Sequence, residues 1–184
     1  MANFLKIVIT PPVDIENEAG KITQLLESGI DFVHIRKPDA SVRDIRNLIE
    51  DIPYPLRKRL KLHGHFELLN DFSLGGAHLN TRCPIAPASA LNISKSCHNL
   101  KELESVSQFE YVTLSPIYDS ISKQGYLSRF KPQNITTRIL GKRVIALGGV
   151  TPYKFSELRD AGFFGAAMLG CVWKDFDSFI NLIK

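Results

Sequence analysis

Four of the five histidines in this 184-residue chain lie near the ends of segments that the sequence predicts to be β-strands. They are His34, His63, His78 and His98. Imidazole changes its charge near neutral pH and binds transition metals, so a group of imidazoles suits acid–base catalysis or a metal site. A single histidine at a strand end is more often a partly buried polar residue. The interest of these four therefore depends on whether the fold brings them together.

Strands and helices are predicted to alternate along the whole chain. Short apolar stretches predict strands over residues 5–10, 31–36, 60–63, 76–79, 91–94, 111–116, 144–149 and 165–169. Helical spacing of apolar residues predicts helices over 15–28, 41–52, 66–72, 100–106, 151–162 and 175–184. Eight β/α units without a linker predict that residues 1–184 form one compact (β/α)8 barrel. An open doubly wound sheet is the alternative, but no Gly-x-Gly-x-x-Gly motif follows a predicted strand.

Two polar residues, Asn70 and Asp71, look like a pair at a strand end. The next predicted strand, however, follows only a few residues later. A connection between parallel strands needs about a dozen residues. We therefore place Asn70 and Asp71 on the short connecting helix, away from the strand ends.

Glycines follow the last two predicted strands, in Gly148-Gly149 and in Leu169-Gly170. In barrels of this kind, the loops after strands seven and eight often bind phosphate through backbone N–H groups. The sequence therefore predicts a phosphate site at these two turns.

Other cationic and hydroxyl groups are placed to hold an anion. Arg36 ends the second predicted strand, and a guanidinium there suits a carboxylate or a phosphate. Ser120, Ser122 and Lys123 belong to a long polar loop over residues 117–131, which could close over the same anion.

The composition favours a cytoplasmic protein that binds a small anionic molecule. The net charge is +4, and the densest basic cluster, Arg57–Arg59 with Lys61, is small and is interpreted as a solvated helix end. We therefore do not expect nucleic-acid binding. No apolar run is long enough to cross a membrane, and the N-terminus lacks the pattern of a signal peptide.

Cys83, Cys97 and Cys171 have no Cys-x-x-Cys spacing, and we expect reduced thiols. Cys97 and His98 are adjacent, so on regular backbone their side chains point apart. A nucleophile–base pair at these two positions is therefore not favoured.

Five short motifs occur in the order found in the thiamine-phosphate synthase/TenI superfamily. They are Val33-His34-Ile35-Arg36, Gly76-Ala77-His78-Leu79, Ser96-Cys97-His98, Ser115-Pro116-Ile117-Tyr118 with Ser122-Lys123, and Ala146-Leu147-Gly148-Gly149-Val150. The chain resembles this family over nearly its whole length. The resemblance implies a (β/α)8 barrel and an enzyme of thiamine biosynthesis that acts on a thiazole phosphate.

The chain departs from the synthases of this family at the metal site. Synthases join a pyrimidine pyrophosphate to the thiazole phosphate, and two aspartates hold Mg²⁺ on the pyrophosphate. The matching positions here are Gly64 and Cys83, neither of which offers the oxygen ligand that Mg²⁺ requires. His34, Pro38 and His63 stand where the synthases have Gln, Lys and Asn.

The resemblance therefore favours a TenI-like thiazole tautomerase, which moves a proton without a metal. His98 would be the general acid/base, and Arg36 with the Ser120, Ser122 and Lys123 loop would hold the substrate carboxylate. The turns at Gly148, Gly149, Leu169 and Gly170 would hold its phosphate. His34, His63, His78 and Ser96 complete the predicted substrate-binding set, and no cofactor is expected.

Three alternatives stay open. The first is a Mg²⁺-dependent synthase in which His34 and His78 face the pyrimidine. The second is a non-catalytic relative that binds the same small phosphorylated molecule. The third is a transition-metal site made by His34, His63 and His78, because imidazole suits Zn²⁺. A homodimer is a further prediction, since the short third and fourth units would leave apolar barrel surface uncovered.

Overall fold

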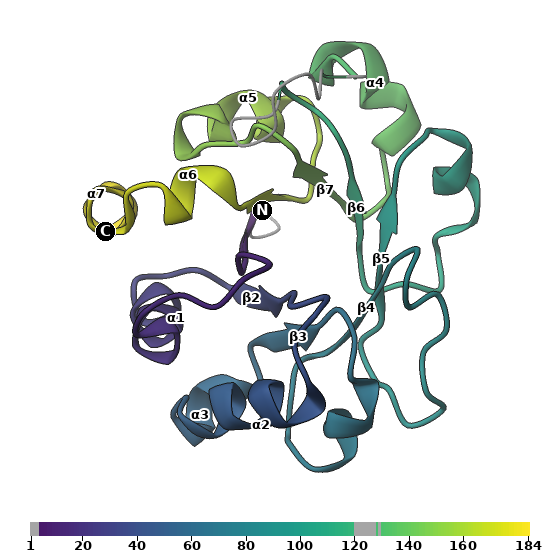
Figure 1. The fold of residues 1–184 in the computed structure, drawn as a ribbon. Coiled ribbons are helices and arrows are strands. Elements are labelled where there is room, and N and C mark those ends of the chain that lie inside the picture. Colours follow the sequence, from purple (N-terminus) through teal and green to yellow (C-terminus); the bar gives the residue numbers. More distant parts are fainter. Residues whose placement is uncertain (1–3, 120–127, 129) are drawn as a thin grey trace.

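The computed structural model describes residues 4–119, 128 and 130–184. Eight parallel strands close into a barrel in their chain order, with the helices arranged outside them (Figure 1). The strands are β1 (Leu5–Ile9), β2 (Phe32–Ile35), β3 (Leu60–Leu62), β4 (Gly76–Leu79), β5 (Ser94–Cys97), β6 (Val112–Leu114), β7 (Val144–Leu147) and β8 (Gly165–Met168). The predicted (β/α)8 barrel is confirmed.

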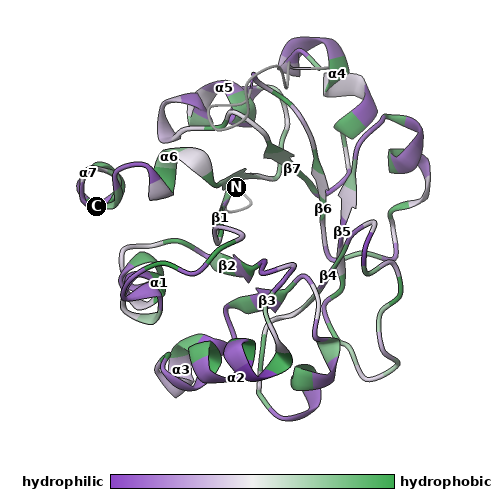
Figure 2. Cartoon of the chain, viewed as in Figure 1, coloured by the Kyte–Doolittle hydropathy of each residue, from purple (hydrophilic) through white to green (hydrophobic). Residues whose placement is uncertain are grey.

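The helices are shorter than most of the predicted ones. The α-helices are α1 (Glu18–Glu27), α2 (Val42–Glu50), α3 (Tyr54–Arg57), α4 (Pro132–Ile139), α5 (Phe155–Asp160), α6 (Gly170–Trp173) and α7 (Phe176–Ile183), and the 3-10 helices are η1 (Phe66–Asn70), η2 (Lys101–Ser105) and η3 (Pro152–Lys154). Green hydrophobic and purple hydrophilic stretches alternate along α1 and α2 in Figure 2, as expected for helices with one face against a barrel.

Alternation along each strand divides the buried residues between two cores. In β1, Val8 belongs to the large core between strands and helices, whereas Ile7 and Ile9 belong to a smaller cluster with Ile145 and Ala167. Successive side chains on a strand point to opposite faces of the sheet, so this second cluster fills the inside of the barrel.

The inside of the barrel is apolar on one side and polar on the other. Strands β1, β7 and β8 supply most of the apolar cluster, which also includes Tyr111 and is contacted by Phe32 of β2, whereas the strands from β2 to β6 supply the buried polar groups. The fully or nearly fully buried polar residues of these strands are His34, Lys61, His78, Ser94 and Thr113. Buried polar groups usually have hydrogen-bond partners, and His34, Lys61, His78 and Ser94 all have them. The hydroxyl of Thr113 has none among the described residues.

The fifth strand starts later than the sequence predicts. The prediction was residues 91–94, but β5 is Ser94–Cys97, paired with β4 at His78 and Ser94. Pairing with both neighbours, and not the local apolar pattern, sets this boundary. The shift places His98 directly after the strand.

The third and fourth units are short, as predicted. η1, after β3, is a 3-10 helix where an α-helix was expected, and within residues 80–93, between β4 and β5, no helix is present. η2, in the fifth unit, is also a 3-10 helix. Ile85 and Leu91 of that connection are largely exposed. Asn70 ends η1 and Asp71 forms an ion pair with Arg46, so both lie away from the barrel strand ends as predicted.

The prediction that Lys61 is solvated is wrong. The residue was interpreted as part of a solvated basic cluster, but its side chain is fully buried in β3. Its Nζ lies 2.6 Å from Oε2 of Glu110. Burial lowers the pKa of Lys61, and the hydrogen bond and charge of Glu110 oppose that change.

In the described part of the chain, no helix is long and apolar enough to cross a membrane.

Candidate active site at the carboxyl ends of the strands

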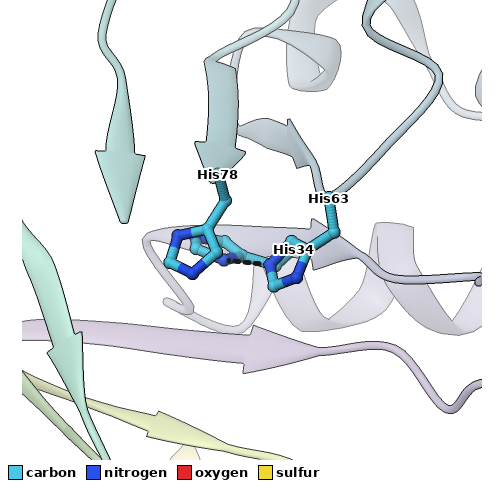
Figure 3. A group of neighbouring side chains, drawn as sticks. All are labelled: His34, His63 and His78. Atoms are coloured by element: carbon cyan, nitrogen blue, oxygen red, sulfur yellow. Dashed lines mark hydrogen bonds between the residues drawn. The ribbon is translucent and has the colours of Figure 1, made fainter. Parts of the chain in front are cut away.

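Three of the predicted histidines meet inside the barrel. His34 of β2, His78 of β4 and His63, which follows β3, point toward one another in Figure 3. The ring centroids of His63 and His78 are 4.3 Å apart, and His34 lies 5.1 Å from the first and 4.9 Å from the second. β2, β3 and β4 are neighbours, and their register pairs His34 with Lys61, two residues before His63, and Leu62 with Ala77, directly before His78. His63 and His78 therefore lie side by side, and His34 reaches them from the preceding inward-facing level.

The three imidazoles have different access to solvent. His34 is completely buried and His78 is 1% exposed, whereas His63 is half-buried. Burial lowers the pKa of His34 and His63 well below the ordinary value and that of His78 to about 3. The trio is therefore neutral at pH 7, which suits a hydrogen-bond network or a metal site better than binding of an anion.

The network extends to two neighbouring strands. Nε2 of His34 lies 2.7 Å from the hydroxyl of Tyr111, just before β6, and Nε2 of His78 lies 2.9 Å from Oγ of Ser96. Ser96, a predicted substrate-binding residue, therefore contacts His78. Sequence reasoning missed Tyr111, although its place two residues before the buried Thr113 is a signal that it points inward.

His98 lies at the carboxyl end of β5, as the barrel prediction requires for a catalytic residue. Its side chain is exposed, and its Nδ1 lies 3.2 Å from Oγ of Ser115, the residue after β6. The backbone N–H of His98 donates to Oε2 of Glu102 at 3.1 Å. One ring nitrogen is thus held by Ser115, and no described residue forms a hydrogen bond with Nε2.

Cys97 does not act together with His98. Its side chain is completely buried, and burial raises the pKa of its thiol to about 11. Since the neighbouring His98 is exposed, the two side chains point apart as expected.

The turn after β7 requires both glycines. Gly148 and Gly149 have φ values of 94° and 63°, and a β-carbon on Gly149 would come within 2.2 Å of the carbonyl oxygen of Asp119. The chain after β6 packs closely here, with the N–H of Tyr118 donating to the oxygen of Gly148 at 3.0 Å. These glycines therefore allow the β6 and β7 loops to meet.

The turn after β8 leads into the short helix α6, with Leu169 before its first residue, Gly170. β7 and β8 are paired, so this turn lies beside the Gly148-Gly149 turn. Among the described residues, none accepts a hydrogen bond from the backbone N–H of Gly149 or Gly170. The arrangement suits the predicted phosphate site.

Arg36 follows β2 and is exposed, and its charge contributes to the lowered pKa of His63. Its backbone N–H donates to Oγ1 of Thr10 at 2.9 Å. Lys37 turns the other way and is buried against Oε2 of Glu18 at 2.6 Å. The predicted anion-binding residues Ser120, Ser122 and Lys123 lie outside the described residues.

The two positions that match the synthase aspartates are adjacent in space. A β-carbon on Gly64 would lie 3.6 Å from Sγ of Cys83. The residues do not fit Mg²⁺, because neither offers a carboxylate. In the described part of the chain, one group of potential metal ligands converges, made of His34, His63 and His78. This group offers nitrogen ligands and no oxygen ligand.

The family model for thiamine monophosphate synthase matches residues 6–172 of this chain. The chain belongs to this family. Thiamine phosphate pyrophosphorylase from Bacteroides thetaiotaomicron has a crystal structure that is 32% identical, with a TM-score of 0.84 over 98% of this chain and 92% of that one. The family resemblance predicted from the five motifs is thereby confirmed.

More distant solved structures share the fold. Thiamine phosphate pyrophosphorylase from Pyrococcus furiosus is 16% identical, with a TM-score of 0.76 over 97% of this chain and 96% of that one. (S)-3-O-geranylgeranylglyceryl phosphate synthase from Thermoplasma acidophilum, solved with sn-glycerol-1-phosphate, is 14% identical, with a TM-score of 0.61 over 99% and 92%. A comparison with curated protein sequences gave no significant match.

Proposed function

We propose that this member of the thiamine monophosphate synthase family is a TenI-like thiazole tautomerase that needs no Mg²⁺. The observation that carries the proposal is the contrast between two parts of the site. Gly64 and Cys83 stand together where the synthases hold their metal, without a carboxylate. His98, by contrast, stands at a strand end with one ring nitrogen available.

The proposed reaction transfers one proton. His98 Nε2 takes a proton from one position of the carboxythiazole ring, and the resulting imidazolium returns a proton at another, giving the aromatic tautomer. No bond between heavy atoms breaks, and no co-reactant is needed. A histidine suits this work because its pKa lies near neutral pH in water.

Substrate binding is assigned to groups around His98. The turns at Gly149 and Gly170 would hold the phosphate through backbone N–H groups. Arg36 would hold the substrate carboxylate, since a guanidinium can bind it with two parallel hydrogen bonds. Ser115 positions the imidazole of His98 through Nδ1.

A second candidate is the synthase reaction. What favours it is the 32% identity to a structure named thiamine phosphate pyrophosphorylase. In that case the pyrophosphate would have to be held without the two aspartates.

A product assay separates the two candidates. Carboxythiazole phosphate is incubated with the enzyme, with and without pyrimidine pyrophosphate and Mg²⁺. We expect conversion of the tautomer without either addition, and a fall of about 100-fold or more in His98→Ala. His65→Asn serves as the control, because His65 has φ 51°, a conformation that asparagine tolerates, and lies outside the proposed site.

Formation of thiamine phosphate or its carboxylated form, only when pyrimidine pyrophosphate and Mg²⁺ are both added, would instead establish the synthase. Binding of the thiazole phosphate with no turnover in any mixture would indicate a non-catalytic relative.

A further inference from the structure

The neutral trio of His34, His63 and His78 has no part in the proposed proton transfer at His98. One ring nitrogen of each histidine lies within 4.8 Å of the others. The dashed line in Figure 3 joins His34 Nδ1 to His63 Nε2, which are 2.9 Å apart. What the trio can bind depends on which nitrogens carry protons.

The contacts of Ser94 fit one tautomer of His78. Ser94 has one hydroxyl proton, and its Oγ donates to the carbonyl oxygen of Ala77 at 3.3 Å. With that proton on the Ala77 carbonyl, the contact with Nδ1 of His78, at 2.9 Å, is one in which the imidazole N–H donates. Nε2 of His78 is left with a lone pair, which accepts from the hydroxyl of Ser96.

His34 is held in a similar way from its far side. The phenol oxygen of Tyr111 lies 2.7 Å from Nε2 and can accept a hydrogen bond from an N–H there, which leaves a lone pair on Nδ1. In metal sites the other ring N–H of a histidine ligand is commonly held by such a partner. Tyr111 and Ser94 therefore stand where the outer partners of two histidine ligands would stand.

We propose that His34 Nδ1, His63 Nε2 and His78 Nε2 bind one divalent transition-metal ion of the zinc type. Three neutral imidazoles are the ligand set of an open zinc site. Zn–N bonds of about 2.0–2.1 Å require the 2.9 Å pair to open by a few tenths of an ångström, and Ser96 to turn its proton away. His63 is half-buried, so a fourth position can open toward solvent for a water molecule or a ligand oxygen.

The surrounding charges permit a dication. Lys61 acts on His34 and His78, and its ion pair with Glu110 compensates that charge. Arg36 acts on His63, but its side chain is exposed, so solvent screens its charge. No carboxylate is needed among the ligands, because three imidazole nitrogens converge within 4.8 Å of one another.

The test uses the metal alone, so its result is independent of the proposed tautomerase activity. Protein stripped with a chelator is titrated with Co²⁺, followed by visible absorption, and with Zn²⁺, followed by calorimetry. We expect one equivalent to bind, with the absorption of four- or five-coordinate cobalt. His63→Gln should weaken binding at least about tenfold, and His65→Asn should leave it unchanged.

Ser96→Ala gives an independent check that does not remove a ligand. It removes the hydroxyl that competes for Nε2 of His78, so metal binding should be equal or tighter. Absence of a bound equivalent in the wild type would overturn the proposal. So would equal binding in a folded His63→Gln protein, or equal loss in His65→Asn.

Discussion

Gly64 and Cys83 are neighbours at the carboxyl end of the barrel, since a β-carbon on Gly64 would lie 3.6 Å from the thiol of Cys83. The two residues come from different loops, one after β3 and one after β4. These are the two positions that the family resemblance aligns with the synthase aspartates, and neither residue carries a carboxylate. This relationship can be tested directly.

The double variant Gly64→Asp with Cys83→Asp should bind a hard divalent cation. Gly64 has no left-handed φ, and its nearest neighbour is at ordinary contact distance, so a side chain fits there. Two adjacent carboxylates supply oxygen ligands that the wild type lacks. We expect Mn²⁺ affinity, measured by electron paramagnetic resonance, to rise at least about tenfold over the wild type. Cys83→Asp alone should show much less gain, and equal affinity in all three proteins would contradict the assignment.

The buried histidines should make the fold sensitive to acid. Their folded pKa values lie below those of the unfolded chain, so the unfolded state binds more protons as the pH falls below about 6.5. Stability is fully present above that pH and is lost as the pH falls toward about 3, the pKa of His78. The free energy of unfolding falls by up to about 1.4 kcal/mol per pH unit for each histidine. Urea unfolding across this range measures it, and His78→Gln should have a smaller slope; an unchanged slope would contradict the prediction.

Glu110→Gln should destabilise the protein at pH 7. Lys61 is fully buried, and removal of its ion-pair partner leaves a charge inside the barrel. Because Glu110 is itself partly exposed, we expect a loss of about 2–3 kcal/mol in the free energy of unfolding. The double variant Lys61→Met with Glu110→Gln removes both charges and should lose less. A larger loss in the double variant would show that packing of the lysine matters more than its charge.

Gly149→Ala should disrupt the predicted phosphate site. The new methyl group would collide with the oxygen of Asp119 and force the turn to move. We expect lower thermal stability, and affinity for inorganic phosphate reduced at least about tenfold. Gly162→Ala is the matched control, because Gly162 also has a left-handed φ, of 88°, but its nearest contact is 4.0 Å away. Equal phosphate affinity in both variants would contradict the site.

Local patterns in the sequence were enough to predict the architecture. The alternation of short apolar stretches with helical periodicity predicted eight units and the closed barrel. The length of a parallel crossover was enough to place Asn70 and Asp71 away from the strand ends. His98 could be singled out because Ser96-Cys97-His98 resembles a family motif, whereas its place directly after β5 depended on the strand register.

Only the tertiary structure decided which residues meet. The start of β5 at Ser94 depends on pairing with β4 and β6, which no local pattern encodes, and the inward direction of Lys61 depends on the same register. The histidine trio and the Gly64–Cys83 pair join residues from separate β/α units. Sequence determines the elements because propensity and periodicity act over a few residues, whereas the site depends on the order and register in which the barrel closes.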